Sequence, residues 1–287
     1  MRVLIVGGTK FIGPHVVRQL VARGAHVTVY HRGEHEPELP RAVCHLHGPA
    51  AAIPVLSFPE EASAPAPDVV IHMIAMGERD ARAAVETFRG RTHRLVAISS
   101  GDVYQAHGRL TGAESGPPAA GLLTENSPLR SVWYPYRHAA RSPDDWVHDY
   151  EKILMERIVL GEPSLQPVVL RLPKIYGPGE NGDLATVHGF RHQPHWRWTH
   201  GYVENVAHAI VLAATHPAAS GIYNIGEAYT PTVEERLAHL PSSSVSTATA
   251  PLNFEHDIAY DTSRIRQELG YVEPIEYRDA LRRTLGA

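Results

Sequence analysis

A short apolar run, Val3 to Val6, is followed at once by Gly7 and Gly8, and Gly13 stands six residues after Gly7. Apolar side chains then recur at helical spacing from Phe11 to Arg23, so the pattern predicts a strand, a glycine turn and a helix. The first glycine permits a tight turn, and the last permits close packing of the helix against the strand. This segment therefore predicts the first β-α unit of a parallel sheet.

Strand-like and helix-like segments continue to alternate along most of the chain, which is typical of a parallel sheet with helices on both faces. We predict an α/β fold: a Rossmann-type doubly wound parallel sheet with a small C-terminal substrate-binding lobe. Residues 1–177, joined by 201–226, are expected to form the sheet domain, and 178–200 with 227–287 the lobe. The further predicted strands are 26–30, 42–46, 68–74, 94–98, 168–171 and 222–225, and the further predicted helices are 78–89, 144–160 and 202–214.

Composition excludes several classes of protein. Of the 287 residues, 27 are Lys or Arg and 31 are Asp or Glu, so the formal net charge of −4 gives no general attraction to nucleic acid or to an anionic membrane. No apolar run reaches membrane-spanning length. The single cysteine, Cys44, cannot form an intramolecular disulfide and is expected to be packed, which fits a reducing compartment. We expect a cytoplasmic protein that binds neither nucleic acid nor membrane.

The glycine turn has the features of a phosphate site. Free backbone N–H groups at the start of a helix can hold a pyrophosphate, and the preceding glycines let it approach. The turn and helix start therefore predict a dinucleotide-binding site. The candidate cofactor-binding residues here are Gly7, Thr9, Lys10, Phe11, Ile12 and Gly13.

Two basic residues bear on the choice of dinucleotide. An NAD site commonly places an acidic residue after the second strand, where it accepts the ribose hydroxyls, but here the sequence continues Tyr30, His31, Arg32. Lys10 stands at the middle position of the glycine turn. Lys10 and Arg32 can hold a 2′-phosphate through charge-assisted hydrogen bonds, which favours NADP over NAD.

Further motifs follow the turn in a fixed order, and together they resemble the extended short-chain dehydrogenase/reductase family, the NAD(P)-dependent epimerase/dehydratase group, over most of the chain. The resemblance implies an enzyme that moves a hydride between the nicotinamide and a sugar-like alcohol carbon, with a nucleotide sugar as one such substrate. It also implies a homodimer formed through the helix that contains Lys152. The motifs that carry the resemblance are Ile98 to Tyr104, Leu170 to Gly179, Gly201 to Ala207 and Ile222 to Gly226.

The resemblance also assigns catalytic residues. Ser100 matches the residue that binds the substrate oxygen, and Lys152 matches the lysine that binds the cofactor ribose. The family places a tyrosine four residues before this lysine on one helix face, a position that His148 occupies here. Tyr150 is two residues before Lys152, and on a helix it would point to a different face.

Three alternatives therefore remain for proton transfer. His148 is the acid/base, or Tyr134 or Tyr136 from the preceding loop replaces the missing tyrosine, or proton transfer has been lost. In the last case the protein would be a non-catalytic NAD(P)-binding sensor or an RNA-associated relative.

The remaining candidates concern the substrate and metals. Asp102 matches an acidic position found in dehydratases of the family, and Arg197 matches the region whose arginines contact a diphosphate. Four histidines cluster in the sequence near Arg197, but they lack Cys or carboxylate partners at zinc spacing. No metal site is predicted. These histidines are His188, His192, His195 and His200.

Overall fold

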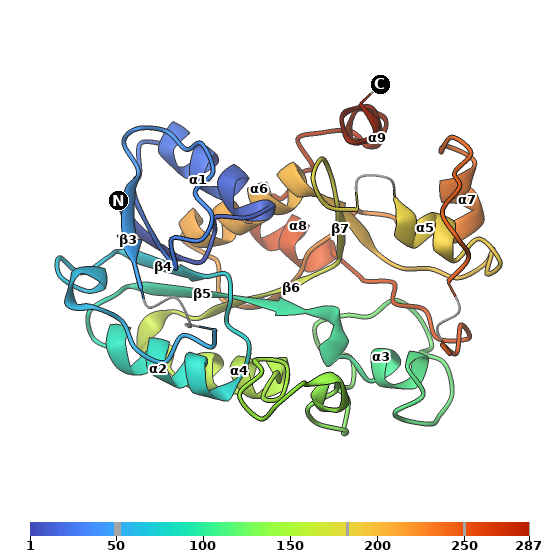
Figure 1. Ribbon diagram of the computed structural model, residues 1–287, viewed down its shortest axis with the longest axis horizontal. Helices are drawn as coiled ribbons and strands as arrows, with labels where there is room; N and C mark the ends of the chain where they lie inside the picture. The colour runs from blue at the N-terminus through green and yellow to red at the C-terminus, as the bar shows by residue number, and fades with distance from the viewer. Residues whose placement is uncertain (49–52, 182–183, 249–250, 287) are drawn as a thin grey trace.

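In the computed structural model, which describes residues 1–48, 53–181, 184–248 and 251–286, a parallel sheet forms the centre of the molecule (Figure 1). Seven strands of the described residues pair in the order β3-β2-β1-β4-β5-β6-β9, and every pairing is parallel. The predicted doubly wound parallel sheet is therefore confirmed. The strands are β1 (Arg2–Val6), β2 (His26–His31), β3 (Cys44–His47), β4 (Val69–His72), β5 (Arg94–Ser100), β6 (Val168–Leu172) and β9 (Gly221–Asn224).

Helices cover both faces of this sheet (Figure 1). The helices α1 (Ile12–Ala22), α6 (Val203–Thr215) and α8 (Ser263–Leu269) pack their apolar side chains against one face. The helices α2 (Glu78–Phe88) and α4 (Lys152–Leu160) pack against the other face. Central strands buried on both sides explain the near-continuous apolar runs in the sequence.

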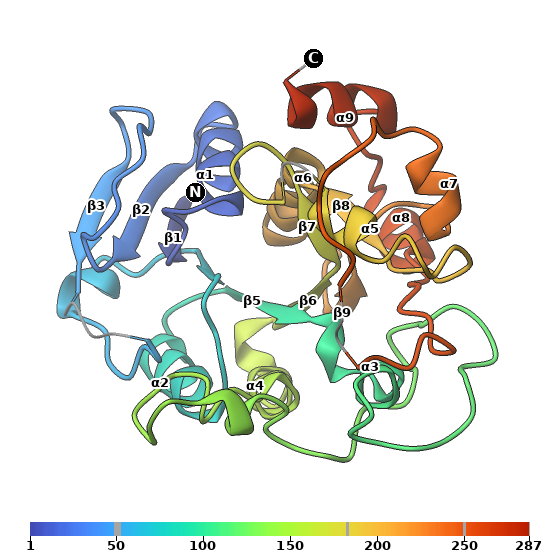
Figure 2. The same cartoon turned by 45° about the vertical axis from the view of Figure 1, so that its right-hand side comes forward.

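A smaller unit follows the end of β6. Here β7 (Lys174–Tyr176) pairs with β8 (His200–Tyr202) in a two-stranded parallel sheet. Figure 2 shows short helices beside this sheet, on the C-terminal side of the molecule. The division into a sheet domain and a substrate-binding lobe stays a prediction. The helices not yet placed on a face of the main sheet are α3 (Gln105–Leu110), α5 (Ala185–Gly189), α7 (Val233–Leu237) and α9 (Tyr277–Leu285).

Two sequence-based expectations are wrong. The helix expected over 144–160 begins only at Lys152, because the Glu151 side chain caps it by accepting a hydrogen bond from the Ile153 N–H at 3.0 Å. The preceding residues form turns. Cys44, expected to be packed, is exposed because β3 is the edge strand of the sheet. No helix within the described ranges has the length and apolar character needed to cross a membrane.

Candidate active site

The glycine turn between β1 and α1 has the backbone geometry of a phosphate cradle. Gly7 has φ +85°, which favours glycine. A Cβ atom on Gly13 would lie 2.1 Å from the Gly8 carbonyl oxygen, so any side chain there would force the helix away from the turn. The turn therefore leaves the N-terminus of α1 open to an anionic group, as a bound pyrophosphate requires.

A cavity of about 480 Å³ opens at this turn. It contains the predicted cofactor residues Thr9 to Ile12 together with Gly7 and Arg32, whereas Gly13 acts through packing below the turn. The sequence-predicted residues of the cofactor site are thus brought together. The lining residues are Gly7, Gly8, Thr9, Lys10, Phe11, Ile12, His31, Arg32, Glu34, His35, Ile53, Met73, Ile74, Met76 and Glu180.

Sequence reasoning missed a carboxylate at the corner of this cavity after β2. Glu34 lines the cavity and forms an ion pair with Arg32, with Nη2 and Oε2 2.7 Å apart. The guanidinium that the sequence assigns to a 2′-phosphate therefore already has a negative partner. The chain bends at Gly33, where φ is +77°, and Glu34 therefore reaches a corner that its position two residues beyond Arg32 does not suggest.

Lys152 lies at the first turn of α4, on the opposite side of the β4 end from the glycine turn, and it is buried. Its Nζ donates to the carbonyl oxygens of Ala75 at 2.5 Å and Ile98 at 2.9 Å. Burial lowers the pKa of Lys152, and nearby Asp80 and Asp102 oppose that effect. An ammonium group has three N–H donors, so one remains for a ligand such as a ribose hydroxyl.

Asp102, just beyond β5, accepts hydrogen bonds from two phenol hydroxyls. Its Oδ2 accepts from Tyr150 Oη at 2.9 Å and from Tyr136 Oη at 3.0 Å. Its Oδ1 is buried and has no hydrogen-bond partner among the described residues. An unpaired buried carboxylate oxygen is costly, so this atom is a ready acceptor for a hydroxyl group that enters the site.

Ser100 ends β5 and joins the same cluster. Its Oγ accepts from the Asp102 N–H at 3.4 Å, and its hydroxyl forms a hydrogen bond that lowers the pKa of Tyr150. Burial and the negative charge of Asp102 outweigh this effect and raise the pKa of Tyr150 well above its usual range. The Lys152 Nζ lies 5.6 Å from the centre of the Tyr150 ring. The structure therefore brings together Ser100, Asp102 and Lys152 of the predicted residues, and adds Tyr150.

His148 occupies a different place from the one expected for it. The segment before Lys152 is not helical, so His148 and Lys152 do not share a helix face. The His148 Nδ1 lies 2.8 Å from Asp149 Oδ1, and its side chain is 31% exposed. The geometric reason for placing His148 at the family's tyrosine position is therefore wrong. The extended backbone of Glu151, which precedes the helix, directs Tyr150 into the site instead.

The loop tyrosines and Arg197 are separated in the structure. Tyr136 reaches Asp102, whereas the Tyr134 ring lies under the Arg137 guanidinium, 3.7 Å from its carbon. Arg197 lines a separate cavity of about 280 Å³ that also contains Glu255 and Asp257. Because two carboxylates share that cavity, it is a poor environment for a diphosphate.

Two buried ion pairs hold this site in place. Arg130 forms two hydrogen bonds with Glu151 at 2.7 and 2.8 Å. Arg171 forms two with Glu156 at 2.7 and 2.9 Å, and Glu156 also accepts from Ser99. The pairs tie β5, β6 and the loop after α3 to the first two turns of α4. The position of Lys152 is thus fixed from three directions.

The family of the protein follows from a sequence comparison. The profile of the NAD dependent epimerase/dehydratase family matches residues 3–226, most of the chain. The protein therefore belongs to this NAD-dependent family, and the resemblance seen in the sequence is confirmed. Comparison with curated protein sequences found no match.

Solved structures of similar fold include several sugar-nucleotide enzymes. A UDP-glucose 4-epimerase of Thermus thermophilus, in complex with NAD, has TM-score 0.71 and 24% identity, with 100% of this chain and 98% of that chain covered. A UDP-glucose 4-epimerase of Thermotoga maritima with UDP-glucose has TM-score 0.73 and 17% identity, with the same coverage. An NAD dependent NDP-hexosamine 5,6-dehydratase has TM-score 0.69 and 22% identity, covering 99% and 96%. At these identities the similarity shows the fold.

Proposed function

We propose that this protein is an epimerase, dehydratase or reductase that transfers a hydride between the nicotinamide of NAD and an alcohol carbon of a sugar, carried on a nucleoside diphosphate. The observation that carries the proposal is the cluster of Ser100, Asp102, Tyr150 and Lys152 at the carboxyl end of the sheet, beside the cavity of the glycine turn. Ligands of open parallel sheets bind at this end. NAD, when bound, supplies the hydride acceptor.

Tyr150 is the acid/base of this proposal, in place of His148. Its phenol is buried and protonated, it is bonded to Asp102, and it lies beside the Ser100 hydroxyl. To act as a base, Tyr150 would first pass its hydroxyl proton to Asp102, which already accepts a hydrogen bond from it. The phenolate would then accept the proton of a substrate hydroxyl that has Ser100 as a second hydrogen-bond partner. The Lys152 ammonium stabilises the phenolate that forms, since opposite charges nearby lower the pKa of a phenol.

Asp102 gives this site a second group that can move a proton. Its free Oδ1 is buried next to the two phenols, where it can accept the proton of a second substrate hydroxyl or position that hydroxyl. A dehydratase needs a further acid/base besides the tyrosine, so Asp102 favours dehydration as one possible reaction. Epimerisation and simple oxidation or reduction are the other two reactions that this site would support.

The proposal takes NAD as the cofactor, and the NADP preference stays a prediction from Lys10 and Arg32. Glu34 supports NAD, because a carboxylate at the end of the second strand can accept ribose hydroxyls and repels a 2′-phosphate. The substrate class rests on the neighbours, two of which are named as UDP-glucose 4-epimerases. A uridine diphosphate hexose is therefore the first substrate to test.

The test compares Tyr150→Phe with His148→Gln. Each variant is incubated with NAD and a panel of UDP-hexoses, and NMR detects new sugar signals. We expect Tyr150→Phe to lose at least about 100-fold in turnover while NAD affinity stays within a few-fold, since a positioned acid/base contributes factors of this size. His148→Gln should retain turnover within about threefold.

The opposite pattern would return the acid/base role to His148. If the native chain binds NAD but converts none of the hexoses, the proposed substrate class is wrong, and a sensor that binds the dinucleotide without catalysis becomes the better account. Calorimetric titration with NAD, run on every variant, separates loss of binding from loss of chemistry.

We also propose that the protein forms a homodimer through the layer of α2 and α4, which lie side by side on one face of the sheet (Figure 1). Two tryptophans, Trp133 and Trp146, are 43% and 41% exposed, and the Arg157 guanidinium of α4 lies over the Trp133 ring. Large exposed aromatic side chains are enriched at interfaces. Light scattering coupled to gel filtration should give twice the chain mass, and Trp133→Ser should reduce that mass.

A further inference from the structure

Three histidines gather where β2 and β3 end, at the edge of the main sheet. The strands pair in parallel with His31 opposite His47 and Val29 opposite His45. Side chains two residues apart on a strand point to the same face, so His45 and His47 share a face with each other and with His31. The register therefore places three imidazoles side by side.

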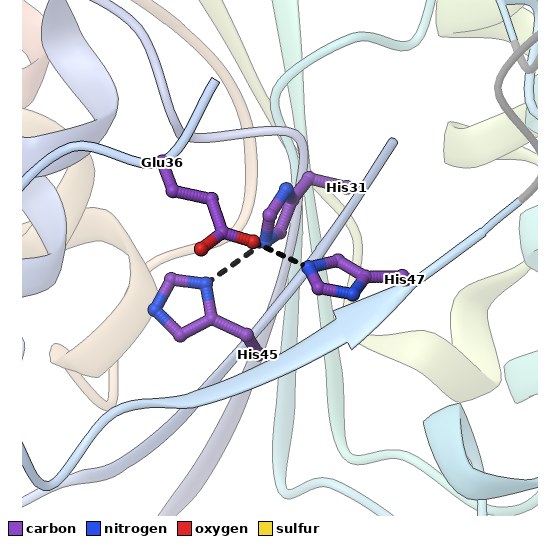
Figure 3. Close-up of side chains that lie close together, drawn as sticks. All are labelled: His31, Glu36, His45 and His47. Atoms are coloured by element: carbon purple, nitrogen blue, oxygen red, sulfur yellow. Dashed lines mark hydrogen bonds and ion pairs between the residues drawn. The ribbon is translucent and has the colours of Figure 1, made fainter. Parts of the chain in front are cut away.

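A carboxylate completes the group. Glu36 returns from the loop after β2, and its Oε1 lies 2.7 Å from His47 Nε2. His31 Nε2 lies 2.9 Å from His45 Nδ1. Figure 3 shows the four side chains pointing toward one another, and one ligand atom from each lies within 4.8 Å of all the others.

The spacing is close to that of a tetrahedral metal site. Zinc binds imidazole nitrogen and carboxylate oxygen at about 2.0–2.2 Å, which puts neighbouring ligand atoms about 3.4 Å apart. The two short contacts here must open by about 0.5 to 0.7 Å to reach that value, and the longest separation must close. Three of the side chains are exposed on an edge strand and a loop, so small rotations suffice.

One hydrogen bond of His31 must change before a metal can bind. A neutral imidazole is the form that binds metal. The Gly33 N–H donates to His31 Nδ1 at 3.1 Å, and a metal on Nε2 would put the ring proton on Nδ1, so binding requires the Gly33 amide to turn away.

We propose that His31, His45, His47 and Glu36 bind a divalent transition metal of the zinc class. Nitrogen-rich donor sets of this kind suit zinc over calcium or magnesium, which take oxygen ligands. Four protein donors fill a tetrahedral site and leave no position for substrate, so the metal stabilises the fold at this edge. The metal would connect three segments: strand β2, the loop that follows it, and strand β3. His31 also lines the cavity at the glycine turn, so the metal site lies beside that cavity. The site does not depend on the proposed activity.

Zinc titration tests the site directly. The full chain, without a polyhistidine tag and stripped by a chelator, is titrated with zinc chloride in a calorimeter. The double variant His45→Gln, His47→Gln removes two exposed ligands and leaves the buried His31 in place. His26→Gln, an exposed histidine at the other end of β2, is the matched control. We expect one zinc per native chain, unchanged binding in the control, and at least about tenfold weaker binding in the double variant.

Two further readouts identify the ligands. Cobalt(II) in place of zinc should give the intense visible bands of a tetrahedral complex with the native chain and not with the double variant. Zinc should raise the melting temperature of the native chain and of His26→Gln only. If the double variant binds zinc as tightly as the native chain, or if the native chain binds none, the proposal is wrong. Circular dichroism confirms that each variant is folded.

Discussion

Single residues decide which dinucleotide the cavity accepts. Arg32 and Glu34 form an ion pair at its corner, and their side chains are 32% and 53% exposed. The carboxylate repels a 2′-phosphate and partly neutralises the arginine that would bind it. We expect Glu34→Gln to raise NADP affinity by about two- to fivefold and to lower NAD affinity slightly, an effect of the size found for exposed charges. Calorimetric titration with both dinucleotides measures it, and equal changes in both affinities would contradict it.

Asp102 decides the ionisation of the tyrosine beside it. Burial raises the pKa of Tyr150, and the Asp102 charge raises it further. Removing that charge therefore lowers the pKa. We expect Asp102→Asn to move the limb of the pH profile of kcat/KM that reports the Tyr150 ionisation to lower pH, and to reduce kcat by about 100-fold or more. NAD affinity should stay within about twofold. A pH profile that does not move would show that the Asp102 charge does not set the pKa of the group that titrates in catalysis.

The first turn of α4 depends on one buried carboxylate. Glu151 accepts from Arg130, from the Tyr134 N–H at 2.6 Å and from the Ile153 N–H, and its side chain is 0% exposed. We expect Arg130→Met to lower the free energy of unfolding by about 3–5 kcal/mol, because it leaves this charge unpaired. The double variant Arg130→Met, Glu151→Gln should recover part of the loss. Urea unfolding of both variants measures this, and an equal loss in the two would show that charge pairing is not the cause.

These elements also show how far the sequence alone leads. Apolar runs and the Gly7 turn predict β1, α1 and the other central strands, because local patterns determine them. The start of α4 depends on Arg130, which lies 21 residues before Glu151 in the chain, so no local pattern contains it. For the same reason the sequence predicts the wrong direction for the Tyr150 side chain. His45 and His47 show a strand-like alternation, but only the register of β2 and β3 brings them beside His31.

At the scale of the whole molecule, the sheet places the dinucleotide cavity and the Ser100 cluster at the carboxyl ends of its strands. The cavity lies at the ends of β1 and β4, and the Ser100 cluster lies at the end of β5, the next strand along. Met76, just beyond β4, lines the cavity, and its carbonyl oxygen accepts from the Glu151 N–H at 3.0 Å. One strand end therefore connects the glycine turn to the first turn of α4, and neither half can move far without the other.

The same interior makes the fold sensitive to acid. His72, at the end of β4, is buried, and neither of its ring nitrogens has a partner among the described residues. Burial, followed by the Lys152 charge, lowers its pKa to about 3. The unfolded chain therefore binds this proton below about pH 6.5 while the folded chain does not, and stability falls as pH falls toward 3. Between about pH 7 and pH 5 this histidine alone should cost about 2 kcal/mol.

Replacing His72 removes that linkage. We expect His72→Leu to lose about 2 kcal/mol less than the native chain when urea unfolding is compared at about pH 7 and pH 5. Other buried imidazoles with lowered pKa values, such as those of His107 and His200, remain in both chains, so the difference between the chains isolates His72. His26→Leu, at an exposed position, should follow the native chain. An equal loss in His72→Leu and the native chain would mean that His72 is reached by water and titrates normally in the folded state.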